Sequence, residues 1–301
     1  MQALQIDSSV LDASPGKRRG GGDLSAAFKA PIAERSIVLR TRGIRHGGIT
    51  RLVSPSDVGE LIKPFVFLDL FDISAANAAN FGWHPHSGIA TLTVLHAGAV
   101  EYQETTGVSG ILSADGVEWM QAGRGVWHTG AVLQKAKGFQ LWIALPEELE
   151  NTPSQSHYLS ADEVTQERPA RVILGSHGRA KSAIRAPARM NYLDVRLAAG
   201  ERWIYQPPSD HEVAWIAVSE GTLRTAEPIL AGELAVFEES NNAIAFEADT
   251  AARFVLGSAA KHPHELVLGR YSVHTTHAAL AAGESEIQRI GGQLVTAGLL
   301  R

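Results

Sequence analysis

The chain has no cysteine, and this excludes several kinds of site at once. Without thiols there can be no disulfide, no cysteine nucleophile, and no zinc or iron–sulfur site with cysteine ligands. An excess of charge is also lacking, because 27 basic and 32 acidic side chains give a formal net charge of −5. Because acidic and basic side chains are nearly equal in number, the protein does not have the positive field that nucleic acid requires, and we expect no direct nucleic-acid ligand.

Long apolar runs are missing as well. Residues 1–33 contain no uninterrupted apolar stretch of the kind that a signal peptide needs, and no later segment is long enough to span a bilayer. We therefore expect a cytoplasmic protein with no membrane partner. Residues 14–22 combine proline, glycines and three consecutive basic residues, which offer little to bury, so residues 1–33 are predicted to form a flexible arm.

What the chain does contain is a long succession of short β-type segments. They are broken by glycine and polar turns and show no sustained helical periodicity, which is typical of an all-β sandwich or barrel. The length of 301 residues favours two domains. We place the boundary just after the proline-bracketed stretch 146–153, giving β domains at 34–155 and 156–301. The tail, from about residue 277 to 298, has apolar residues at helical spacing and is predicted to be a short helix packed on the barrels.

Two imidazoles stand one residue apart just before an apolar, β-type run at 89–95. Side chains at i and i+2 of an extended segment point to the same face, so His84 and His86 can approach one ion while Pro85 points away. His128 closes a glycine-rich phrase at 123–128 and is the expected third ligand. Neutral imidazole suits divalent transition metals, and fewer than four protein ligands leave positions for water or substrate.

The two halves of the chain share a weak internal repeat, in which an apolar strand is followed by a glycine turn, an apolar residue and a charge. We match the turn glycines Gly98 with Gly221, and Gly116 with Gly232. The three histidine positions of the first half then fall on residues that are poor metal ligands, namely Pro207, Ser209 and Ile244. The second half is therefore predicted to keep the scaffold and to lack the site.

Several motifs, taken together, resemble those of the pirin family. They are HPHSGIATLT at 84–93, the Gly98 turn, GVEWMQAGRGVWH at 116–128, QLWIALP at 140–146 and GRYSVHT at 269–275. The resemblance covers most of the chain from about residue 36 onward. It implies a bicupin, in which two jelly-roll β-barrels are stacked in one chain and the N-terminal barrel holds a single metal ion, usually iron.

The resemblance carries three histidine ligands onto His84, His86 and His128, but the fourth ligand has no counterpart. Pirin has a glutamate two residues after its last histidine, where this chain has Gly130, and usually another at the place of Ala90. Three arrangements stay open: three imidazoles with water, which we favour, a substitute acceptor, or a site that binds metal poorly. Candidates for a substitute ligand or hydrogen-bond acceptor at the site are Glu118, Glu104 and Gln140. Losing an anionic ligand favours nickel, copper, cobalt or zinc relative to iron.

The resemblance also implies two functions of different classes. Some pirin-like proteins have quercetin 2,3-dioxygenase activity, which needs a small aromatic substrate in a pocket beside the metal. We expect Glu118, Trp127 and Gln140 to contribute to such a pocket, but the sequence identifies no catalytic base, because the family glutamate is replaced by Gly130. The alternative is a non-catalytic, redox- or metal-responsive module that regulates a protein partner. A purely structural bicupin without metal is the third possibility.

Overall fold

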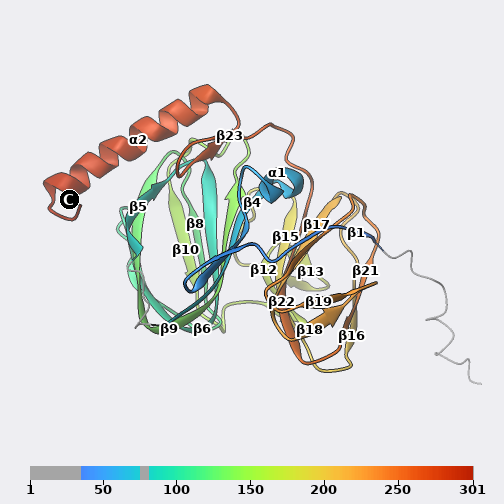
Figure 1. The fold of residues 1–301 in the computed structure, drawn as a ribbon. Helices are drawn as coiled ribbons and strands as arrows, with labels where there is room; N and C mark the ends of the chain where they lie inside the picture. The colour runs from blue at the N-terminus through green and yellow to red at the C-terminus, as the bar shows by residue number, and fades with distance from the viewer. Residues whose placement is uncertain (1–34, 75–80, 301) are drawn as a thin grey trace, which may run out of the picture. The chain divides into compact units, whose positions relative to one another are not determined.

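The computed structural model describes residues 35–74 and 81–300, and strands dominate them (Figure 1). The predicted flexible arm at 1–33 lies outside the described residues. Most strands belong to two sets of sheets, one for each predicted β-barrel. Two small hairpins, β13 (Ser176–His177) with β14 (Ala180–Lys181) and β23 (Val267–Leu268) with β24 (Val273–His274), and the short helix α1 (Val58–Ile62) complete the connections.

The first barrel is a nine-stranded sheet in the order β10-β8-β6-β9-β4-β3-β2, with β5 added on β9 and β7 on β6. Its strands are β2 (Ile44–His46), β3 (Ile49–Val53), β4 (Phe65–Ser74), β5 (Phe81–His86), β6 (Ile89–Glu104), β7 (Ser109–Ser113), β8 (Val117–Gln121), β9 (Val126–Ala144) and β10 (Gln155–Leu159). The two longest strands, β6 and β9, pair antiparallel and shift register around Gly98. Gly98 has φ +87°, and a Cβ there would lie 1.6 Å from the Lys135 carbonyl oxygen, so only glycine fits this close approach.

The second barrel consists of a seven-stranded sheet, β1-β20-β17-β22-β15-β12-β11, and a four-stranded sheet, β16-β21-β18-β19. The strands of the larger sheet are β1 (Ile37–Thr41), β11 (Gln166–Glu167), β12 (Ala170–Leu174), β15 (Met190–Leu197), β17 (Val213–Glu220), β20 (Leu234–Phe237) and β22 (Ala252–Ala259). Those of the smaller sheet are β16 (Arg202–Tyr205), β18 (Thr222–Arg224), β19 (Pro228–Leu230) and β21 (Ile244–Ala248). Apolar side chains from both sheets form one core between them.

A hydrophobic core shared by both barrels lies against the large sheets. It contains Leu92 and Leu141 of the first barrel together with Trp215 and Val255 of the second, all essentially without solvent exposure. Because side chains alternate along a strand, the neighbours of these residues point into the barrels instead. On β6 the neighbour that faces inward is Thr93, which lines a cavity.

Strands cross the predicted domain boundaries in both directions. β1 pairs with β20 of the second barrel, and β10 pairs with β8 of the first. The boundary at residue 155 therefore stays a prediction. The segment 34–155 contributes β1 to the second barrel, and β10, which begins at residue 155, belongs to the first barrel. This exchange ties the N-terminal part of the described chain to the second barrel.

A buried ionic cluster also joins the two barrels. Asp194 on β15 is fully buried and accepts hydrogen bonds from Arg171 at 3.0 Å and from Arg253 at 2.7 Å. Arg253 also donates to Asp115 at 2.7 Å, and Asp115 lies in the turn between β7 and β8 of the first barrel. The imidazole of His96, on β6, lies 3.5 Å from Asp194. Such a cluster is stable only when every charge has its partners.

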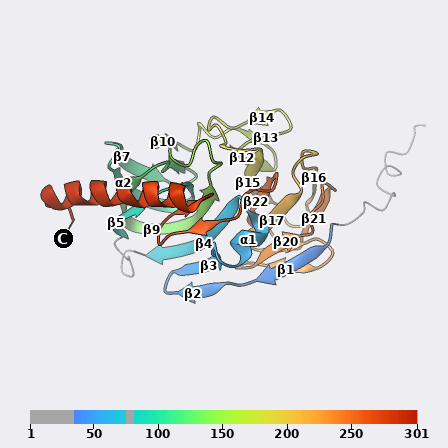
Figure 2. The same ribbon diagram turned by 90° about the horizontal axis from the view of Figure 1, so that it is seen from above.

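The predicted C-terminal helix is present as α2 (His277–Thr296), which packs on β5 and β9 (Figures 1 and 2). Thr276 caps it by accepting a hydrogen bond from the Ala279 amide, and Ile287, Ile290 and Leu294 form its buried face. Among the described residues, neither helix is both long enough and apolar enough to cross a membrane.

Candidate metal site

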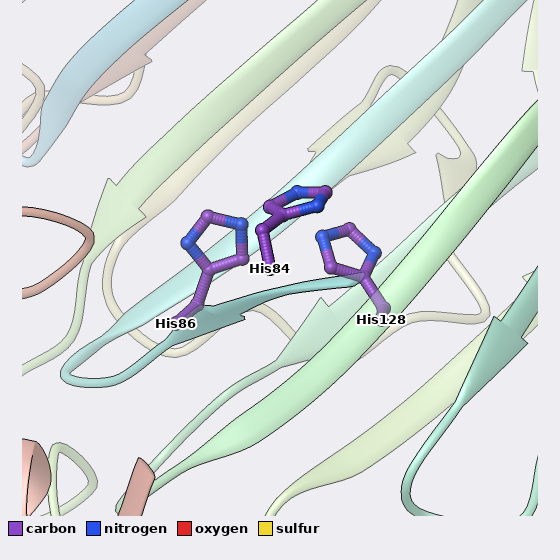
Figure 3. Close-up of side chains that lie close together, drawn as sticks. All are labelled: His84, His86 and His128. Carbon is purple, nitrogen blue, oxygen red and sulfur yellow. The ribbon is translucent and has the colours of Figure 1, made fainter. Parts of the chain in front are cut away.

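Two neighbouring strands bring the three predicted histidines together. His84 and His86 lie on β5, and His128 lies opposite His84 where β5 pairs with β9. The ring centroids are 4.2 Å apart for His84 and His128 and 5.1 Å apart for the other two pairs. The rings converge on a common region (Figure 3), and one nitrogen of each lies within 4.8 Å of the others. The geometry thus suits three imidazoles around one ion.

The hydrogen bonds of His84 and His86 leave the Nε2 atom of each ring available. Nδ1 of His84 lies 2.8 Å from the Gly82 carbonyl oxygen, and Nδ1 of His86 lies 3.1 Å from that of Tyr271. These contacts fix the ring orientation and direct Nε2 away from the backbone. Nε2 of His128 is buried and has no hydrogen-bond partner among the described residues. A buried polar atom without a partner is costly, unless it serves as a ligand.

All three imidazoles have a lowered pKa. Burial lowers the pKa of His86 to about 3, with a further contribution from His84, and outweighs the Tyr271 carbonyl. Burial also lowers the pKa of His84 and, well below its usual value, that of His128. Each ring is therefore neutral at pH 7, and neutral imidazole is the form that binds a metal.

A cavity of about 210 Å³ adjoins the three rings. Most of its walls are apolar, and their aromatic members include Phe71, Phe81, and the pair Phe67 and Trp142, whose rings stack at 4.1 Å. Tyr102 and Tyr158 stack at 3.7 Å on another part of the wall. An apolar cavity with a few polar groups is the usual form of a small-molecule site.

Glu118 and Gln140, both predicted to contribute to a pocket, line this cavity together with Thr93. Thr93 Oγ1 contacts the Glu118 carboxylate and lies 2.7 Å from Gln140 Oε1. The Thr93 hydroxyl has one proton and cannot donate to both oxygens. Either Glu118 is protonated and donates to Thr93, or the Gln140 amide is flipped so that its nitrogen donates to Thr93. Burial, helped by the charge of Glu104, raises the pKa of Glu118 to about 7 against the effect of the Thr93 hydrogen bond.

Glu104, the other predicted acceptor, is not among the residues that line the cavity. Its carboxylate accepts hydrogen bonds from Ser156 at 2.6 Å, from Thr106 at 2.7 Å, and from the Tyr158 hydroxyl. These donors occupy both oxygens. Although Glu104 lies opposite His128 in the pairing of β6 with β9, its carboxylate is held by these donors and ties β6 to β10 and to the following turn.

The structure corrects the prediction for Trp127. This residue precedes His128 on β9, so alternation turns its side chain away from the cavity and toward α2. There its indole Nε1 donates to the Ile287 carbonyl oxygen at 2.7 Å, and Gly291 packs against its ring. Trp142 is the tryptophan that lines the cavity. Sequence reasoning also missed the Tyr271 carbonyl, which lies 185 residues from His86 and has no local signal.

The position of the missing family glutamate is open. Gly130 lines the cavity, and a Cβ placed on it would have no neighbour closer than 3.6 Å. A side chain at this position would meet no steric barrier at its first atom. The carboxylate that does approach the histidines comes from β8, because Glu118 Oε1 lies 3.9 Å from His128 Nδ1.

Known proteins resemble this chain in sequence. The family model named Pirin matches residues 48–143. A pirin-like protein of Caulobacter vibrioides is 30% identical over 220 residues, which cover 69% of this chain and 79% of that protein. This chain belongs to the pirin family. The predicted resemblance is thereby confirmed.

Solved structures agree with the predicted architecture of this pirin-family protein. A quercetin 2,3-dioxygenase from Acinetobacter baumannii matches with a TM-score of 0.78 at 22% identity, covering 85% of this chain and 98% of the other. The bacterial pirin YhhW of Escherichia coli in complex with nickel(II) matches with a TM-score of 0.59 at 20% identity, covering 77% and 97%. At these sequence identities the matches are evidence for the fold alone, and they confirm the predicted all-β bicupin.

Proposed function

We propose that this protein binds one divalent transition metal through His84, His86 and His128 and oxidises a small hydroxylated aromatic compound, as a quercetin 2,3-dioxygenase does. The observation that carries the proposal is the buried Nε2 of His128, which has no partner among the described residues and faces two further imidazoles. Relatives support it, since one pirin structure contains nickel(II) and a dioxygenase shares the fold.

The donor set fits a metal of intermediate softness. Three neutral imidazoles with no carboxylate ligand favour nickel, cobalt, copper or zinc over iron. When bound, such a metal supplies a Lewis acid for a substrate oxygen and open positions for exogenous ligands. The protein contributes the orientation of the rings, through the carbonyl groups of Gly82 and Tyr271.

The cavity walls favour a planar aromatic ligand. The stacked pair of Phe67 and Trp142 offers a flat apolar surface, and Thr93 and Gln140 offer hydrogen bonds to a ligand hydroxyl or carbonyl. The volume of about 210 Å³ lies below the range of sites for drug-sized ligands and therefore favours a small compound. The apolar lining would also keep water away from the reacting atoms.

A second function is a metal-responsive module that regulates a protein partner without turnover. The glycine at position 130 and the alanine at position 90 favour it, because two carboxylates expected in the family are replaced by residues without acid–base groups. In this case the histidines would bind metal, but the cavity would support no reaction.

One experiment separates these functions. Protein loaded anaerobically with iron, nickel, cobalt, copper or manganese is mixed with a flavonol or, separately, with a smaller hydroxylated aromatic compound, and then with oxygen, while the absorbance of that compound is followed. Metal-dependent bleaching that His128→Ala abolishes supports the enzyme. Metal binding without bleaching for all five metals favours the regulatory module. If elemental analysis finds no metal in the wild type after loading, both functions are wrong.

A further inference from the structure

We infer that Glu118 supports this metal site through His128: its carboxylate accepts a hydrogen bond from His128 Nδ1 when His128 Nε2 binds the metal. Glu118, on β8, would thus supply the negative charge that the glycine at position 130 does not provide. The inference rests on the proposed metal site. It assigns Glu118 as a positioning residue and not as a fourth ligand.

The first argument is the uneven set of partners around the three rings. Nδ1 of His84 and Nδ1 of His86 each approach a backbone carbonyl oxygen. Nδ1 of His128 has no carbonyl partner among the described residues, and the carboxylate oxygen Glu118 Oε1 lies 3.9 Å away. A metal on Nε2 requires the proton to be on Nδ1, and that proton needs an acceptor. Glu118 is placed to be that acceptor after a shift of about 1 Å, since such bonds are about 2.9 Å long.

The second argument is that Glu118 is held beside His128 and not in the ring of ligand atoms. Its other oxygen, Oε2, contacts the Thr93 hydroxyl, which fixes the side chain against β6. The mutually close ligand atoms are those of the three histidines, and the carboxylate of Glu118 is not among them. Glu118 can therefore act on the metal through the imidazole of His128.

The third argument is charge. Three neutral imidazoles leave a divalent ion with its full charge inside an apolar barrel, where an unbalanced charge is unfavourable. The other acidic residue of the cavity wall, Asp69, is already paired with Arg51 at 2.5 Å. Among the described residues lining the cavity, Glu118 is the carboxylate without a cationic side-chain partner. A carboxylate on the outer nitrogen of a ligating histidine makes that ligand more basic.

The test measures nickel(II) affinity by chelator competition and the visible absorption bands of the cobalt(II) protein. Glu118→Gln keeps the shape and removes the charge, and we expect affinity to fall about tenfold to a hundredfold and the cobalt bands to shift. Glu150→Gln is the matched control, because this carboxylate is buried, does not line the cavity, and accepts its hydrogen bonds from Thr275. We expect it to change neither readout.

A rescue variant makes the test independent of folding losses. Gly130→Glu in the Glu118→Gln background places a carboxylate in the open position, and we expect it to restore affinity. If Glu118→Gln does not fold, as judged by thermal unfolding of the metal-free protein, Glu118→Ala takes its place, because it also removes the carboxylate, and the same fall in affinity is expected. Wild-type affinity and unchanged cobalt bands in the Glu118 variant would overturn the inference while the metal site stands. Failure of the wild type to bind nickel would overturn both.

Discussion

The two barrels of this protein share a fold but differ in what fills them. In the first barrel, the inward face of β6 and β9 carries Thr93 and Gln140, and a cavity remains beside the histidines. In the second barrel, the corresponding face of β17 and β22 carries Ile216, Leu256 and Phe254, which are fully buried in a continuous core. The outward faces of the same strands are equally apolar in both barrels, because they build the shared core.

The strand pair that holds the ligands shows the difference most directly. In the first barrel, β5 and β9 place His84 opposite His128. By chain order and pairing, β16 and β21 are their counterparts, and these place Tyr205 opposite Ile244 and Trp203 opposite Phe246. Phe246 stacks with Trp203 at 5.7 Å and packs on Phe254 at 5.3 Å. Large aromatic residues thus take the space that remains as a cavity in the first barrel.

The structure also corrects one anchor of the internal repeat. Gly98 and Gly221 correspond as predicted, since both have positive φ and both lie against a backbone carbonyl of the facing strand. The second anchor moves by one residue. The Asp115 amide donates to the Leu95 carbonyl as the Gly232 amide does to that of Val218, and both residues have positive φ. Gly232 therefore corresponds to Asp115 and not to Gly116.

The largest expected effect on stability comes from breaking the buried ionic cluster around Asp194 that joins the barrels. Asp194→Asn removes the fully buried carboxylate that Arg171 and Arg253 share, and leaves the half-buried Asp115 as their remaining acidic partner. We expect the free energy of unfolding to fall by about 3–5 kcal/mol, as measured by urea denaturation. Asp249→Asn, at an exposed ion pair with Arg224, is the control and should cost less than about 1 kcal/mol. Equal losses in the two variants would contradict a central role for the cluster.

A matched pair of leucines tests whether one barrel is filled and the other hollow. Leu223→Ala in the second barrel removes a fully buried side chain from a packed core, and we expect a loss of about 2–5 kcal/mol. Leu112→Ala in the first barrel enlarges a cavity that already exists, so we expect roughly half that loss or less. Thermal or chemical unfolding of both variants measures the difference. A larger loss for Leu112→Ala would refute the comparison.

Metal should stabilise the first barrel in a way that depends on its histidines. Nickel(II) at a free concentration one hundred times its dissociation constant should raise the free energy of unfolding by about 2.7 kcal/mol. We expect His128→Ala to abolish this gain, because it removes a ligand, and His264→Ala, in the His-Pro-His sequence of the second half, to keep it. Differential scanning calorimetry with and without nickel makes the measurement. Retention of the full gain in His128→Ala would exclude this site.

The buried ionic cluster should also make the free energy of unfolding depend on pH. Burial alone would raise the pKa of Asp194, but the hydrogen bond from Arg253 and the charges of His96, Arg253 and Arg171 together lower it to about 2. A folded-state pKa below the unfolded value gives stability that is present above about pH 4 and is lost as pH falls toward 2. We expect this loss, on the order of 2 kcal/mol, in the difference between wild type and Asp194→Asn. A difference that stays constant from pH 5 to pH 2 would contradict it.

The smallest effect is expected at an ion pair on the surface between the barrels. Lys137 on β9 lies 2.5 Å from Glu220 on β17, and the glutamate side chain is 51% exposed. Exposed pairs contribute little, so Lys137→Ala should cost at most about 1 kcal/mol, and the cost should shrink as salt is added. Unfolding at low and high salt measures it. A loss as large as that of Asp194→Asn would mean that the surface pair, and not the buried cluster, joins the barrels.

The sequence was sufficient for most of the architecture. The alternation of apolar residues, the spacing of the turns and the amphipathic tail predicted two β-barrels and the terminal helix, since these features depend on local periodicity. The grouping of His84 with His86 was predictable for the same reason. His128 needed the further assumption that a glycine-rich turn directs the chain back, and the pairing of β5 with β9 meets that assumption.

The sequence by itself determined which strands form, which faces are apolar, and that His84 and His86 point to one side of a strand, with no carboxylate at positions 90 and 130. Only the tertiary structure decided that Glu118 approaches His128, that Tyr271 orients His86, and that Trp127 turns toward α2. These contacts join residues from separate strands or from opposite ends of the chain. Local propensities do not encode such contacts, because they arise only when packed sheets and a returning C-terminal segment bring distant residues together.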